Sequence, residues 1–171
     1  RLRSILGFEP PPAYRLLPAR VISVTGEPLP VSAAINMGIE DSVLVNHPVI
    51  NQVGLVGRVQ EVMPGYAKVQ LLTDPLNRVA GRVATSREMG IVRYLPSEGM
   101  ILDNFPNQGA IQVGDTILSS GLGGIYPPGL RVGIVSDVRR PENKPYSLIK
   151  LEPAVNFRTI EELFILMPEG P

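Results

Sequence analysis

Short apolar runs rich in β-branched residues recur along the whole chain and are separated by residues that favour turns. They cover residues 19–25, 32–36, 54–63, 66–72, 78–83, 89–95, 99–102, 116–119, 131–140, 146–151 and 162–167. Gly, Pro, Asn or Asp stand at the breaks between them, which is typical of β-strands joined by tight turns. The pattern predicts about a dozen strands.

The spacing of these runs favours closed β-structure. No helical pattern lies between them, so βαβ units, which need a crossover helix, are disfavoured against sandwiches or barrels. Long helices are also hard to place because the chain has 17 Gly and 18 Pro, which interrupt helical hydrogen bonding. Closure removes the Val-rich edges that would otherwise invite aggregation. We therefore predict an all-β fold of two small six-stranded β-barrels.

The domain limits follow from breaks in the apolar pattern. Residues 1–8 form at most a short helix that stops at the prolines 10–12, so residues 1–18 are interpreted as the end of a helix and a linker. The polar cluster 73–77 follows an apolar run. It predicts a first barrel over 19–75 and a second over 76–159, with the strand 160–167 as a candidate to return to the first barrel.

Composition excludes several classes of function. Lys plus Arg and Asp plus Glu both number 16, so no net field would attract nucleic acid. Cysteine is absent and there is a single histidine, which removes disulfides, thiolate catalysis and most zinc sites. We predict no metal and no cofactor. No apolar run is long enough to span a membrane. Because the chain opens at Arg1 without an initiator Met, we expect it to be part of a longer protein with a further N-terminal portion, in which anchoring elements would have room.

The leading enzymatic alternative is the hypothesis that the chain is a two-barrel hydrolase of the serine-protease kind. His47, Asp74 and Ser120 stand in the chain order of the chymotrypsin triad. A nucleophile needs a tight glycine-flanked turn, however, and the sequence before Ser120 has the pattern of a strand. We predict that the chain is not an enzyme. A fluorophosphonate probe acting at Thr116, Ser119 or Ser120 would contradict this.

The glycines have a structural explanation. The glycine-rich segment 113–135 lacks the Lys and the following helix of a phosphate-binding loop, and its Gly-Asp, Ser-Gly and Pro-Gly pairs are typical of turns. In the segment 54–59, Gly-Leu-Val-Gly-Arg-Val, small residues inside an apolar strand allow another backbone to come close.

These same segments, taken in order, resemble the signature of the MreC family. They are 54–59, then 114–115, 119–124, 126–127, 129–130 and 132–135. The departures are small: Ser119 stands where the family usually has Thr, Tyr126 where it often has Phe, and Pro128 is an added proline. The resemblance covers residues 19–167.

The resemblance implies a function in bacterial cell shape. It implies a pair of barrels similar to the trypsin fold without the catalytic site, on the periplasmic or extracytoplasmic side of the inner membrane, anchored by an N-terminal segment. It also implies that residues 1–8 are the end of the family's coiled-coil helix. Such a protein would be a scaffold that controls peptidoglycan synthesis. It would self-associate as a dimer or filament and bind a class B penicillin-binding transpeptidase, MreD and RodA, and indirectly MreB.

The candidate contact residues are Leu122, Ile125, Tyr126 and Pro127, which form an apolar turn between glycines. A scaffold must present apolar contacts that monomers usually hide, and this turn is the best candidate. The alternative is that these residues plug one end of a barrel. A further alternative is a β-domain that binds a glycan or another small ligand.

Overall fold

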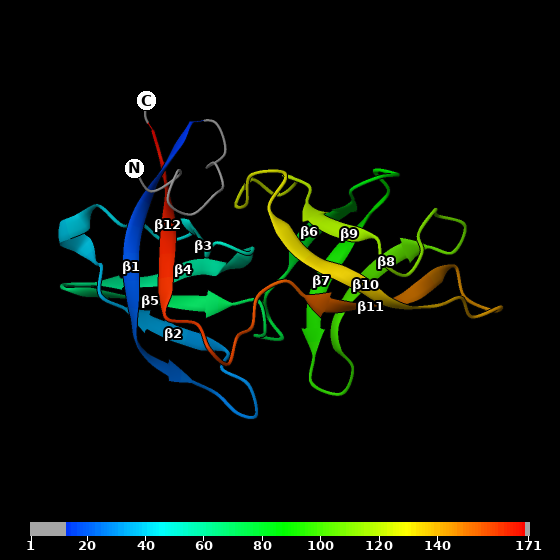
Figure 1. The fold of residues 1–171 in the computed structure, drawn as a ribbon, viewed down its shortest axis with the longest axis horizontal. Coiled ribbons are helices and arrows are strands. Elements are labelled where there is room, and N and C mark those ends of the chain that lie inside the picture. The colour runs from blue at the N-terminus through cyan, green and yellow to red at the C-terminus, as the bar shows by residue number, and fades with distance from the viewer. Residues whose placement is uncertain (1–12, 170–171) are drawn as a thin grey trace. The chain divides into compact units, whose positions relative to one another are not determined.

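The chain folds into two compact units, each of which is a closed barrel of six antiparallel strands (Figure 1). The computed structural model describes residues 13–169. Unit 1 takes the chain up to Leu71 and again from Val155, and unit 2 is Leu72–Ala154. The prediction of an all-β fold with two six-stranded barrels is confirmed.

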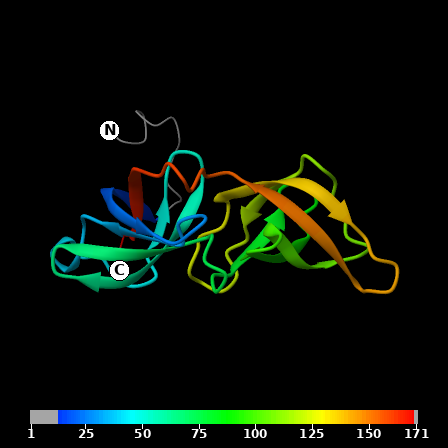
Figure 2. The ribbon, with the colours of Figure 1, turned by 90° about the horizontal axis from the view of Figure 1, so that it is seen from below.

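Unit 1 places its strands in the order β1-β12-β3-β4-β5-β2 around the barrel. They are β1 (Tyr14–Thr25), β2 (Ser32–Ile35), β3 (Pro48–Ile50), β4 (Leu55–Met63), β5 (Tyr66–Leu71) and β12 (Glu162–Pro168). A 3-10 helix, η1 (Ile39–Asp41), is the one helix within residues 13–169. Figure 2 shows β12, in red, beside β1, in blue. The last strand of the chain therefore closes the first barrel.

Unit 2 is formed by one continuous stretch of chain, with the strand order β10-β11-β8-β7-β6-β9. The strands are β6 (Val79–Val83), β7 (Met89–Leu95), β8 (Gly99–Pro106), β9 (Thr116–Ser119), β10 (Arg131–Arg139) and β11 (Tyr146–Pro153). Strands β9 and β10 pair with each other and are joined by residues 120–130. This connection is the glycine-rich turn identified from the sequence.

Each barrel has its own apolar core. In unit 1 the largest fully buried side chains are Ile35, Leu55, Leu71, Leu163, Ile165 and Leu166, and in unit 2 they include Met100, Leu102, Phe105, Ile117 and Ile149. Burying one such side chain contributes about 1.5–3 kcal/mol. The cores hold the strands in register and so fix where the connecting turns lie.

A glycine in β4 confirms the sequence interpretation of segment 54–59. Gly57 lies opposite Leu71 of β5, and a Cβ atom at Gly57 would stand 1.9 Å from the carbonyl oxygen of Gln70. No side chain fits at that distance. The two backbones approach closely because residue 57 has none.

The strand β3 is absent from the ranges expected from the sequence, and other strands are longer than expected. β3 has three residues and begins at Pro48, directly after a turn closed by a hydrogen bond from the His47 N–H to the Leu44 carbonyl. Three residues after a proline give no recognisable strand pattern. Two other strands are longer than expected: β1 begins at Tyr14 rather than at residue 19, and β8 runs on to Pro106 rather than ending at residue 102.

The units divide near the predicted polar turn, but a few residues earlier. The division falls after Leu71 and again after Ala154, against the expected limits of 75 and 159. The turn 73–77 belongs to unit 2, where the Asp74 carboxylate accepts a hydrogen bond from the Leu76 N–H at 2.9 Å. The helix expected at residues 1–8 lies outside the described residues.

Candidate partner-binding loop

Residues 120–130 form a loop whose base is fastened by one buried serine. The Ser119 hydroxyl donates to the Pro127 carbonyl at 2.6 Å and accepts from the Leu130 N–H at 2.9 Å. The backbone of Ser119 also bonds with Leu130 and Gly129. Ser119 is completely buried, so these bonds are shielded from water and hold the two ends of the loop together.

Tyr126 fixes the middle of the loop to the interior of unit 2. Its side chain is 6% exposed, and its hydroxyl accepts a hydrogen bond from the Asn77 side-chain amide at 3.1 Å. Pro127 is buried next to it. A buried phenol needs such a partner, because an unpaired hydroxyl away from water is costly.

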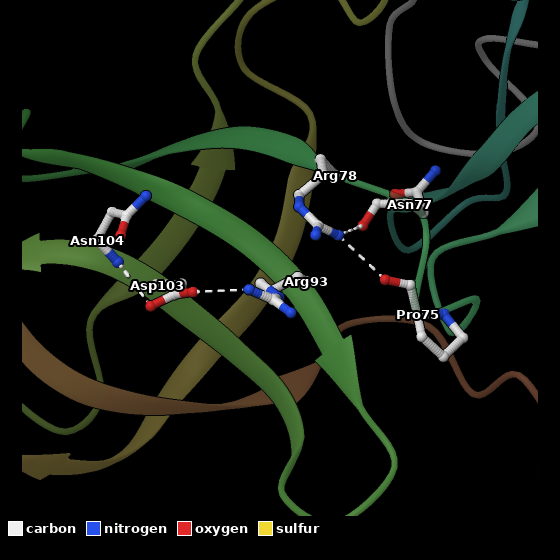
Figure 3. Close-up of polar contacts among 6 residues, drawn as sticks. All are labelled: Pro75, Asn77, Arg78, Arg93, Asp103 and Asn104. Atoms are coloured by element: carbon white, nitrogen blue, oxygen red, sulfur yellow. Dashed lines mark hydrogen bonds and ion pairs between the residues drawn. The ribbon is translucent and has the colours of Figure 1, made fainter.

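The turn that carries Asn77 is itself held in place. Figure 3 shows the Arg78 guanidinium donating to the carbonyl oxygens of Pro75 and Asn77, at 3.0 and 3.3 Å. These contacts fix the backbone from which the Asn77 amide reaches Tyr126. The loop is thereby supported by a turn that lies far away in the sequence, since Asn77 and Tyr126 are 49 residues apart.

Of the four candidate contact residues, one is exposed, one is half-buried and two are buried. Leu122 is 61% exposed and Ile125 is half-buried. The Leu122 N–H donates to the Ser120 hydroxyl at 3.2 Å, which orients the start of the tip. Gly124 has φ +79°, a conformation that L residues rarely adopt. The loop therefore presents Leu122 at its tip, with Ile125 partly covered and Tyr126 and Pro127 beneath.

The sequence reasoning did not find two residues that shape this loop, Ser119 and Asn77. A signal existed for Ser119, because residues 116–119 alternate and Ser119 shares the inward face with the buried Ile117. A polar residue at an inward position needs hydrogen-bond partners close by. Asn77 gave no such signal, because its contact with Tyr126 is distant in sequence.

The residues of the protease alternative have structural hydrogen bonds. The Ser119 hydroxyl proton is directed to a backbone carbonyl, and the Ser120 hydroxyl accepts from a backbone N–H. His47 lies in unit 1, where its Nδ1 accepts from the Leu44 N–H at 3.2 Å. Asp74 and Ser120 lie in unit 2. Each of these contacts fastens a local turn, which is a sufficient role for the residue type.

Two titratable groups are shifted, and both shifts have local causes. Burial lowers the pKa of the His47 imidazole from its usual 6.5, since the charged form loses hydration. Backbone N–H groups of Glu40 and Gly65 hold the pKa of the Glu40 carboxyl below its usual range, and the Gly65 N–H lies 2.8 Å from its oxygen. Within residues 13–169 there is no cluster of three acidic, His or Cys side chains able to hold a metal.

A polar pocket of about 280 Å³ lies in unit 1. The residues that line it include Asn51, Asn156, Thr159, Glu161 and Glu162. Amide, hydroxyl and carboxylate groups are the hydrogen-bonding groups that a sugar would need. The ligand-binding alternative stays a prediction. None of the helices found in the described part of the chain has the length and apolar character to cross a membrane.

Comparison with known proteins agrees with the fold. Residues 21–167 match the family model described as "Rod shape-determining protein MreC, barrel core". The chain is 35% identical over 133 residues to the cell shape-determining protein MreC of Caulobacter vibrioides, covering 78% of this chain and 38% of that protein. It is 28% identical over 171 residues to the Escherichia coli protein of the same name, covering 97% and 46%. The chain spans less than half the length of these relatives.

Solved structures give the same architecture. A crystal structure of MreC from Pseudomonas aeruginosa is similar with a TM-score of 0.82 at 30% identity, covering 88% of this chain and 99% of that one. Two more distant structures share the fold. One is described as the major periplasmic domain from the cell shape-determining filament MreC (TM-score 0.77, 18% identity, covering 94% and 99%). The other is a complex between penicillin-binding protein PBP2 and MreC from Helicobacter pylori (TM-score 0.73, 16% identity, covering 92% and 99%).

Proposed function

Because this chain belongs to the MreC family of rod shape-determining proteins, we propose that it is a non-enzymatic scaffold of the bacterial cell-elongation machinery. It binds peptidoglycan-synthesis enzymes and so controls where the wall grows. The family is defined by its part in cell shape rather than by a reaction. The structural hydrogen bonds of Ser119 and Ser120 agree with a role in binding.

The main partner in this proposal is a class B penicillin-binding transpeptidase. The complex of PBP2 with MreC from Helicobacter pylori supports this choice, because that chain has the same fold. The observation that carries it in this protein is the exposed Leu122 on a fastened loop. A rigid loop loses little conformational freedom on binding, so the burial of Leu122 contributes more of its free energy to affinity.

Self-association and further partners complete the proposal. The related structure described as a filament domain supports self-association as a dimer or filament. MreD and RodA, and indirectly MreB, are partners implied by membership of the family. The same description, which names a periplasmic domain, supports a location outside the inner membrane, with an N-terminal segment as the anchor.

A binding titration tests the proposal. The 171-residue chain is titrated against the extracytoplasmic region of a class B transpeptidase, and light scattering on the chain alone measures self-association. We expect saturable binding that the change Leu122→Ser weakens by about tenfold, equivalent to about 1.4 kcal/mol. The same change leaves the free energy of unfolding within about 0.5 kcal/mol, because Leu122 is exposed.

Val113 supplies the matched control. It is 62% exposed, close to the value for Leu122, but it precedes β9 whereas the loop follows that strand. Val113→Ser should bind the transpeptidase as the wild type does. Equal affinity for the Leu122→Ser chain and the wild type would contradict the role of the loop, and absence of saturable binding by the wild type would contradict the scaffold proposal.

A further inference from the structure

Four side chains of unit 2 form one row across neighbouring strands. Arg131 of β10 lies opposite Leu118 of β9, Leu118 lies opposite Arg82 of β6, and Arg82 lies opposite Met89 of β7. Side chains directly opposite one another on antiparallel strands have Cβ atoms about 5 Å apart. The row therefore alternates cationic and apolar groups at close spacing. We refer to these four residues as the arginine row.

The arginine row lies on the outer surface of the barrel. On each strand a residue directly adjacent to the row is buried, namely Val132, Ile117, Val83 and Gly90. Successive side chains of a strand point to opposite faces, so the row itself points outward. Met89 is 48% exposed and Arg131 is exposed, while Leu118 and Arg82 are half-buried.

One guanidinium nitrogen in the row has no partner. The Nη1 atom of Arg82 is buried and makes no hydrogen bond within residues 13–169. On the neighbouring strand, Arg93 also leaves its Nε unpaired, but its Nη1 bonds the Asp103 carboxylate at 3.0 Å (Figure 3). The ion pairs found in the described part of unit 2 involve Arg93, Arg139 and Lys150, and neither Arg82 nor Arg131.

The Arg82 Nη1 atom is itself buried, so an incoming carboxylate would pair with the exposed Arg131 and with the part of the half-buried Arg82 side chain that solvent reaches. Arginine binds carboxylates through two parallel hydrogen bonds and is enriched at protein interfaces. The chain has 16 cationic and 16 acidic residues, so a general field does not attract anions. Attraction at the row would come from the local arrangement of Arg82 and Arg131.

The row is continuous with the candidate loop. Leu118 and Arg131 lie at the two ends of the connection 120–130, on the strands that carry it. A protein held at Leu122 therefore has the arginine row at the base of the same loop. The alternation of charge and apolar surface favours a peptide segment over a bare anion, because Leu118 and Met89 gain nothing from a phosphate.

We propose that the arginine row docks an acidic segment of a protein partner in which carboxylates alternate with apolar side chains. The carboxylates pair with Arg82 and Arg131, and the apolar side chains pack on Leu118 and Met89. That this partner is the elongation enzyme bound by the loop rests on the function proposed above. The chemistry of the row does not depend on that identity.

Synthetic peptides test the chemistry directly. A fluorescein-labelled octapeptide of alternating Glu and Leu is titrated with the full 171-residue chain, and its twin of alternating Gln and Leu serves as the neutral probe. We expect the acidic peptide to bind at least tenfold more tightly, and added salt to reduce the difference. Arg82→Gln and Arg131→Gln should each weaken its binding by about threefold to tenfold.

Arg139→Gln is the matched control, because Arg139 lies on β10 and its Nε already bonds Asp137 at 3.0 Å. It should bind the acidic peptide as the wild type does. Equal binding of the two peptides, or unchanged binding by Arg131→Gln, would overturn the inference. Arg131 is exposed, so this variant remains informative if Arg82→Gln fails to fold.

The transpeptidase titration separates the two proposals. If the row variants bind the acidic peptide weakly but the enzyme normally, the enzyme is not the partner of the row. If the wild type binds the peptide but no transpeptidase, the proposed function is wrong and the row still docks acidic segments.

Discussion

Replacing Ser119 by Ala should destabilise unit 2 and release the loop. The side chain is 0% exposed, and the change removes two hydrogen bonds at once. It leaves the Pro127 carbonyl without its donor and the Leu130 N–H without its acceptor. A buried polar group left unpaired costs about 1–3 kcal/mol, and Leu130 is only half-buried. We expect a loss of about 2–3 kcal/mol in the free energy of unfolding.

Urea unfolding followed by circular dichroism measures this loss, and thermal unfolding should show a decrease of roughly 10 °C or more in the melting temperature of a unit of this size. Ser120→Ala is the control. The Ser120 hydroxyl accepts one hydrogen bond at 3.2 Å on a half-buried residue, so its loss should cost about 0.5 kcal/mol.

The Ser119 variant should also bind the transpeptidase more weakly than its stability alone explains, because the tip with Leu122 is no longer held. A Ser119→Ala chain that unfolds within about 0.5 kcal/mol of the wild type would refute the claim that this hydroxyl fastens the loop. So would a Ser120→Ala chain that is destabilised to the same extent.

Three further predictions follow from the geometry of single residues. Gly57→Ala should lower the free energy of unfolding, measured in urea, by more than about 3 kcal/mol, because its Cβ would stand 1.9 Å from a carbonyl oxygen. Gly65→Ala is the control: its Cβ would meet nothing within 4 Å, so the change should cost only about 1 kcal/mol, which comes from the positive φ of residue 65. Tyr126→Phe keeps the buried ring and removes the hydroxyl that accepts from the Asn77 amide. We expect a destabilisation of at least about 1 kcal/mol with unchanged transpeptidase affinity, and a marked loss of affinity would place the hydroxyl in the interface. Burial lowers the pKa of His47 below 6.5, so the unfolded chain takes up a proton first as the pH falls. The contribution of His47 to stability is therefore complete above pH 6.5 and should decrease as the pH falls toward the folded pKa. His47→Gln should reduce this pH dependence in urea titrations between pH 5 and 8, and an unchanged slope would contradict the prediction.

The sequence predicted the barrels well because strand periodicity and turn chemistry are local. The strand β7 begins and ends at the expected residues, and the close approach at Gly57 was readable from a glycine inside an apolar run. The three-residue strand β3 has no range among those expected, because a run of three residues that starts at a proline carries little local pattern and its pairing with β4 and β12 defines it. Pairing between distant strands leaves no local pattern.

The candidate loop shows the same limit at the level of side chains. Its position, its glycines and its apolar character were evident in the sequence, but the sequence did not show which of its side chains are buried and which are exposed. Tyr126 is buried and its hydroxyl accepts a hydrogen bond from Asn77, 49 residues away, whereas Leu122 is exposed. The arginine row is likewise a product of register between four strands.

The position of β12 imposes an order on biosynthesis. Arg20 of β1 pairs with Glu162 of β12, and all of unit 2 lies between them in the chain. During synthesis the second barrel can therefore be completed while the first barrel still lacks β12. Until the ribosome has released the last strand, β1 and β3 have unpaired edges, which are sites for misassembly with other chains. Contacts between strands so far apart in the sequence also slow folding, so the first barrel should be the slower one to fold.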